Sequence, residues 1–95
     1  GNGAAAAEYL KQLTRQFPGQ EHLWLKLAEA EGMARNIVGV HRARAEYDVL
    51  MGDLESAQRQ LRQAQEKLPA GAPQRQIVTE RLAEITSRLH ARANS

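Results

Sequence analysis

Hydrophobic residues along this chain recur three and four positions apart, which is the period of a helix with one apolar face. The pattern is clearest in the second half of the chain. There it is formed first by Leu54, Ala57, Leu61, Ala64 and Leu68, and then by Val78, Leu82, Ile85 and Leu89, with Ile77 beside the second stripe. These stripes predict two amphipathic helices that pack on each other.

Breaks in the pattern divide the chain into five predicted helices, at about 4–16, 21–35, 38–51, 54–68 and 73–91. Pro18 and Gly19 end the first helix, because proline cannot continue it and glycine accepts a turn. Asn36 is predicted to end the second helix as a left-handed cap. Gly52 occupies the position of a C-terminal cap glycine, and Asp53 that of the next N-cap.

The first three helices have less regular apolar faces. The residues predicted to point inward are Ala6, Leu10, Leu13 and Phe17 in the first helix, Leu23, Trp24, Leu27, Ala28 and Ala30 in the second, and Ala43, Tyr47, Leu50 and Met51 in the third. Connections of two to five residues require successive helices to run antiparallel. An open stack of hairpins and a closed bundle both satisfy this requirement.

Composition agrees with a single helical domain over residues 1–95. Aromatic residues make up 4% of the chain, and cysteine is absent, so neither a disulfide nor a thiolate zinc site is expected. The longest apolar run is far short of a membrane span.

Small residues at fixed positions indicate which helical architecture to expect. The set Ala45, Gly52, Asp53, Ala57, Leu61, Ala64 and Pro69 falls on the spacing of a tetratricopeptide (TPR) repeat, a helix–turn–helix unit of about 34 residues. The best-formed repeat is therefore 38–69. Residues 4–18 fit the second half of a preceding repeat, 21–35 the start of a degenerate one whose second helix is missing or merged, and 73–91 a capping helix. A dimer seam is the less favoured interpretation of that last helix.

The second half of the chain also resembles a particular family. The runs 41–47 (HRARAEY), 51–54 (MGDL), 57–64 and 75–85 are similar to the C-terminal TPR tail of bacterial HExxH zinc metallopeptidases. The resemblance implies a periplasmic or membrane-associated protein linked to outer-membrane assembly and quality control. It also implies that this segment docks substrates or partners, with zinc expected only in a catalytic domain that this chain lacks.

No catalytic, metal or cofactor site is expected within the chain itself. It contains no HExxH sequence, and His22, His41 and His90 are too far apart to share a metal at helical ligand spacing. No glycine-rich phosphate loop or nucleophile setting is present either. The arginines are interleaved with glutamates, which would cancel most of the field that a nucleic acid requires.

The sequence therefore predicts a non-catalytic protein–protein interaction module that binds a protein or peptide on the concave side of the stack. Repeat phase places six residues there: His22, Leu25, Glu29, Arg42, Glu46 and Val49. The charged members would orient the bound segment, and Leu25 and Val49 would supply apolar contact. A free-standing adaptor and a weakly self-associating module remain the alternatives.

Overall fold

The computed structural model describes residues 2–95 of the chain and is all-helical over that range. The helices are α1 (Asn2–Gln16), α2 (Glu21–Met33), α3 (Ile37–Leu50), α4 (Leu54–Glu66) and α5 (Pro73–Ala93). The predicted all-α fold class is confirmed, and each predicted helix is present with its ends shifted by at most two residues.

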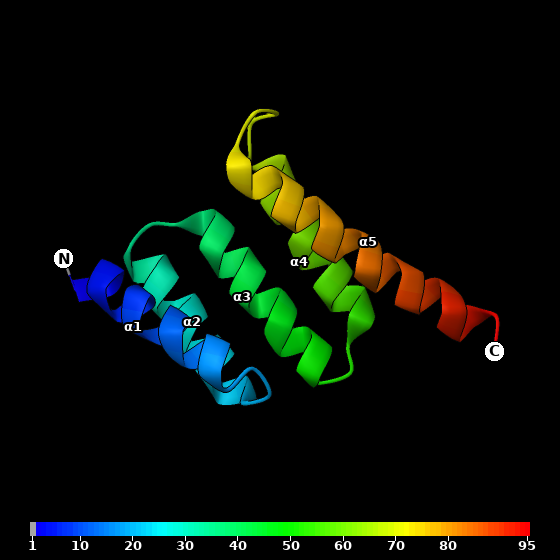
Figure 1. The fold of residues 1–95 in the computed structure, drawn as a ribbon, viewed down its shortest axis with the longest axis horizontal. Coiled ribbons are helices and arrows are strands. Elements are labelled where there is room, and N and C mark those ends of the chain that lie inside the picture. The colour runs from blue at the N-terminus through cyan, green and yellow to red at the C-terminus, as the bar shows by residue number, and fades with distance from the viewer. Residues whose placement is uncertain (1) are drawn as a thin grey trace.

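The helices form a flat, open stack of antiparallel hairpins (Figure 1). Within residues 2–95, extensive packing joins only successive helices, so α1 and α5 do not meet to close a bundle. The molecule measures 46 × 31 × 18 Å, and its two termini lie at opposite ends of the long axis. The open stack is thus the arrangement that this chain adopts.

Two hydrophobic clusters hold the stack together. The larger cluster joins α3, α4 and α5 through Val38, Ala45, Leu54, Ala57, Leu61, Ala64, Val78 and Ile85. The smaller joins α1, α2 and α3 through Ala7, Leu27, Ala28, Ala30 and Ala43, with Leu10 and Trp24 packed against them. Ala45, Ala57 and Ala64 are fully buried, as expected of small residues that let helices approach closely.

The turn between α3 and α4 follows the sequence prediction. Gly52 has a positive φ of 80°, and its amide donates to Val49 O at 3.1 Å. The amide of Asp53 reaches back to Asp48 O at 2.8 Å, which completes a Schellman turn. The Asp53 carboxylate then accepts a bond from the Ser56 amide at 3.0 Å and caps α4.

The turn between α2 and α3 has the same hydrogen-bond pattern, and here the prediction for Asn36 is wrong. The left-handed residue is Arg35, at φ 61°, and its amide donates to Gly32 O at 3.1 Å. The Asn36 amide donates to Glu31 O at 2.9 Å, and its side chain accepts from Gly39 N at 3.2 Å. Asn36 is therefore the N-cap of α3, and α2 and α3 form a hairpin with no helix missing between them.

The inward faces of α1 and α3 differ from those predicted. On α1 the buried residues are Gly3, Ala7 and Thr14, whereas Ala6 is exposed and Phe17 is 52% exposed. The reason is the close approach at Gly3, where an added Cβ would lie 2.7 Å from the Ala34 amide nitrogen. This contact sets the rotation of α1 on α2.

Helix α3 lies between α2 and α4 and therefore buries two opposite sides instead of one stripe. Ala43 belongs to the smaller cluster and Ala45 to the larger one, two positions and about half a turn apart. Leu50 and Met51, predicted to point inward, are instead 41% and 57% exposed. A single-stripe pattern cannot describe a helix with a neighbour on each side.

Helix α5 packs along α4 as the stripe predicted. Val78 and Ile85 are buried, and Leu82 and Leu89 pack against the same cluster. Gln58 bonds Thr86 at 3.0 Å and Gln65 bonds Thr79 at 3.0 Å along the exposed edge of the pair. These contacts fix α5 in register on the last hairpin, where it forms one side of the groove described next.

Candidate functional site

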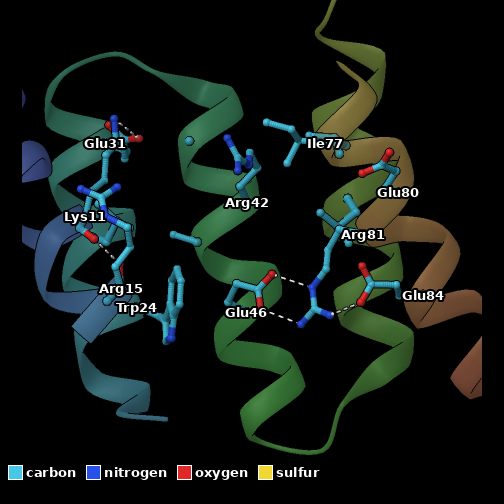
Figure 2. Close-up of a pocket in the computed structure, with 16 residues that line it drawn as sticks. Lys11, Arg15, Trp24, Glu31, Arg42, Glu46, Ile77, Glu80, Arg81 and Glu84 are labelled. Atoms are coloured by element: carbon cyan, nitrogen blue, oxygen red, sulfur yellow. Dashed lines mark hydrogen bonds and ion pairs between the residues drawn. The ribbon is translucent and has the colours of Figure 1, made fainter. Parts of the chain in front are cut away.

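A groove of about 540 Å³ runs across the face of the stack where α1, α3 and α5 lie (Figure 2). We call it the central groove. Its lining residues are Lys11, Thr14 and Arg15 of α1, Trp24, Leu27 and Glu31 of α2, Gly39, Arg42, Ala43 and Glu46 of α3, Leu61 of α4, and Ile77, Val78, Glu80, Arg81 and Glu84 of α5. All five helices contribute, and α3 and α5 contribute most.

The central groove has an apolar part formed by Trp24, Leu27 and Ala43 together with Ile77 and Val78. Trp24 is half-buried, and its indole Nε1 donates to Pro18 O at 2.9 Å, which fixes the ring. Ile77 is 52% exposed although it stands on a helix whose neighbouring apolar residue, Val78, is buried. A half-buried tryptophan and an exposed isoleucine supply preformed apolar contact area for a ligand.

A buried carboxylate lies at the α1–α2 side of the groove. The Glu31 residue is 4% exposed, and its Oε2 accepts from Asn36 Nδ2 at 3.1 Å and lies 3.8 Å from Lys11 Nζ. The carboxylate packs directly on Gly39, where any Cβ would overlap it. Glu31 is thus compensated by a cation and an amide, as a buried charge must be.

On the opposite side, Arg81 of α5 makes a bidentate ion pair with Glu46 of α3. Arg81 Nε donates to Glu46 Oε2 at 2.9 Å and Arg81 Nη2 to Glu46 Oε1 at 2.8 Å, while Nη1 reaches Glu84 Oε2 at 3.2 Å (Figure 2). The hydrogen bond to Glu46 raises the pKa of the Arg81 guanidinium above its usual value, against the lowering effect of burial. The group therefore stays charged, and its stabilising effect is lost only at strongly alkaline pH.

Not all of the charges in the groove are paired. Within residues 2–95, neither Arg15 nor Arg42 has a carboxylate at ion-pair distance. Arg15 is exposed on α1 and Arg42 is half-buried on α3. Glu80 on α5 accepts a bond from Gln76 Nε2 at 3.1 Å and likewise has no cation partner there.

The six residues that the sequence assigned to the concave side do not lie together. Arg42 and Glu46 line the central groove. His22 and Glu29 are exposed on α2 and Leu25 is half-buried there, but the groove side of that helix is formed by Trp24, Leu27 and Glu31. Val49 packs against the larger hydrophobic cluster.

The difference arises from how the helices alternate. Repeat phase assigned α2 and α3 to the concave side, whereas in the structure α3 and α5 supply most of the groove lining and α1 and α2 supply three residues each. In an unbroken stack of hairpins, alternate helices face the same side. Since α3 lines the groove, this rule would have predicted α1 and α5 beside it, and so Arg15, Arg81 and Ile77. The sequence interpretation placed a missing helix after α2, and this error prevented the alternation from being recognised.

Within the described residues 2–95, no group of three or more histidine, aspartate or glutamate side chains is arranged to hold a metal ion. His41 instead pairs its Nδ1 with Gln60 Oε1 at 2.7 Å between α3 and α4. None of the helices of that range has the length and apolar character needed to cross a membrane.

Comparison of the chain with protein-family models, with curated proteins and with solved structures finds no match.

Proposed function

We propose that this chain is a non-catalytic protein-recognition module of the TPR type that binds a peptide segment of another protein in the central groove. The observation that supports this best is the groove itself, which combines a preformed apolar surface with charges that the chain leaves unpaired. Its volume of about 540 Å³ falls in the range of about 300–1,000 Å³ that is typical of ligand sites. Burial of Ala45, Ala57 and Ala64 supports the repeat assignment.

The groove is suited to a peptide because it presents both apolar and charged side chains. Trp24 and Ile77 offer apolar contact from opposite sides, while Arg42 and Glu80 offer charges beside them. Interfaces of this kind gain affinity from a few aromatic and aliphatic anchors and orientation from charged groups around them. The arrangement provides both within one groove.

We propose further that the module is the docking tail of a periplasmic or membrane-associated zinc peptidase. The support is the resemblance of residues 41–85 to such tails. Sequencing the complete gene tests it, because an upstream signal peptide and HExxH domain are expected. If the complete protein lacks a peptidase domain, the chain is a free-standing adaptor.

Peptide selection tests the binding function directly. Random peptides displayed on phage are selected against the 95-residue chain, and the enriched sequences are synthesised with a fluorescent label. Their affinity for the chain and for two variants is then measured by fluorescence anisotropy. Ile77→Asp introduces a charge into the groove, and Met33→Asp does the same at a position that is 72% exposed and outside the groove.

We expect Ile77→Asp to weaken binding about tenfold or more and Met33→Asp to leave it unchanged. Equal effects of the two variants, or no enriched peptide, would contradict binding in the groove. Sedimentation of the chain over a range of concentrations tests self-association, the alternative that the sequence left open. A dimer that Ile77→Asp dissociates would assign the groove to a second copy instead.

A further inference from the structure

The central groove is neutral in formal charge, but some of its charged side chains have no ion-pair partner. Four cationic and four anionic side chains line it: Lys11, Arg15, Arg42 and Arg81, and Glu31, Glu46, Glu80 and Glu84. Lys11 lies 3.8 Å from Glu31, and Arg81 pairs with both Glu46 and Glu84. Within residues 2–95 this leaves two arginines and one glutamate without an ion-pair partner.

The unpaired charges lie on different sides of the groove. Arg15 stands on α1 at one side of the groove, Arg42 on the central helix α3, and Glu80 on α5 at the other side (Figure 2). Glu80 is exposed and accepts a bond from Gln76. Arg42, in contrast, is half-buried and makes no side-chain hydrogen bond within the described chain. Arg42 is therefore the charged side chain in the groove that would gain most from a partner of opposite charge.

A carboxylate is the best partner for the Arg42 guanidinium. Guanidinium presents a planar fork that matches a carboxylate with two parallel hydrogen bonds, and such charge-assisted pairs are stronger than neutral ones. Because the apolar side chains of Ala43 and Ile77 line the same groove, a bound segment would exclude water from Arg42. Partial desolvation lowers the effective dielectric and strengthens the attraction.

We infer that the central groove selects partner segments in which an acidic side chain adjoins a bulky apolar one. The acidic side chain pairs with Arg42, with Arg15 extending the positive edge, and the apolar side chain packs between Trp24 and Ile77. This inference rests on the proposed peptide-binding function and names its partner class. A basic side chain placed beside the apolar contacts would be repelled by Arg42, so this position of the groove disfavours it.

Matched charge reversals on α3 test the inference. Arg42→Glu changes the groove, whereas Arg44→Glu makes the same change of charge two positions along the same helix, at an exposed residue outside the groove. Peptides that were selected for binding to the chain are tested unchanged. They are also tested with their acidic residue replaced by glutamine or lysine. We expect Arg42→Glu to weaken the acidic peptide about tenfold or more, and Arg44→Glu to change it by less than about twofold.

The lysine-substituted peptide should regain affinity for the Arg42→Glu protein, which a merely unfolded variant could not do. Circular dichroism checks that both variants keep their helices. If Ile77→Asp weakens peptide binding but neither Arg42→Glu nor replacement of the peptide's acidic residue changes it, the charge inference is overturned and the proposed function stands. If no peptide binds the groove, both fail. Tighter binding of a single-stranded oligonucleotide than of the acidic peptides would also overturn the inference.

Discussion

Arg81 of α5 donates two parallel hydrogen bonds to the Glu46 carboxylate of α3, of 2.9 Å and 2.8 Å. The two residues are 35 positions apart in sequence, on α5 and α3, and α4 lies between these helices in the chain. Apart from this pair, α5 is held mainly by its packing on α4. The ion pair therefore joins α5 directly to α3, the two helices that supply most of the groove lining.

Replacing Arg81 with lysine should lower the free energy of unfolding by about 0.5–1.5 kcal/mol, because lysine keeps the charge but cannot form the bidentate bond. The pair is about a quarter exposed, so solvent screening limits the effect. Urea denaturation of Arg81→Lys measures it. Arg88→Lys, at an exposed position of the same helix, is the control and should leave the free energy of unfolding unchanged. Equal stability of both variants would show that α5 does not depend on this pair.

The two Schellman turns predict opposite effects of two substitutions. Arg35 and Gly52 occupy the same left-handed position, and only glycine adopts that backbone without strain. Arg35→Gly should therefore stabilise the chain by about 0.5–1 kcal/mol, whereas Gly52→Ala should destabilise it by about 1 kcal/mol. Thermal denaturation compares both with Gly71→Ala, where an added Cβ meets nothing within 4 Å. A loss of stability in Arg35→Gly would mean that the arginine side chain makes a contact that outweighs the strain.

Gly39→Ala should destabilise the chain by about 1–3 kcal/mol, since the new methyl group would displace the buried Glu31 carboxylate and crowd Asn36. The control is Gly32→Ala, where the nearest atom to an added Cβ is Val40 Cγ2 at 3.8 Å. That change should stabilise α2 by about 0.5–1 kcal/mol.

A double variant identifies the cause of the Gly39→Ala effect. If the clash with Glu31 is responsible, adding Glu31→Ala should cost much less in the Gly39→Ala background than in the parent chain. Additive losses in urea denaturation would show that the methyl group acts elsewhere.

Arg75 closes the turn before α5 by donating from Nη1 to Leu68 O at 2.8 Å and to Gln65 O at 3.1 Å. These carbonyls lie at the C-terminal end of α4, where a cation is favourable. Arg75→Ala should lower the free energy of unfolding by about 1–2 kcal/mol. Amide exchange should rise in the last turn of α4 and the first of α5, and remain unchanged in α1. A uniform rise across all helices would instead indicate general destabilisation.

The elements that the sequence predicted best are those set by local chemistry. Helix α4, its Asp53 cap and the Gly52 turn depend on residues within a few positions of one another, so their pattern is visible without the fold. The turn at Arg35 was not recognised because arginine is an unusual residue in a left-handed backbone. The surrounding Glu31, Asn36 and Gly39 contacts hold it there.

The sequence predicted only the part of the candidate site that depends on local chemistry. Arg42 and Glu46 belong to α3, whose position next to the well-formed Gly52 turn fixed its orientation. The other groove charges come from α1, α2 and α5, and their meeting depends on the rotation of each helix about its own axis. Tertiary contacts such as Gly3 on the Ala34 backbone decide those rotations.

By itself the sequence determined that this chain forms five helices, each antiparallel to the next, because 3.6-residue periodicity, caps and short turns act over a few residues. The tertiary structure decided that these helices form an open stack and that all five contribute to one groove, α3 and α5 most. It also decided that Arg81 reaches Glu46 while Arg42 stays unpaired. These outcomes depend on close packing between helices, which side-chain spacing along one helix does not encode.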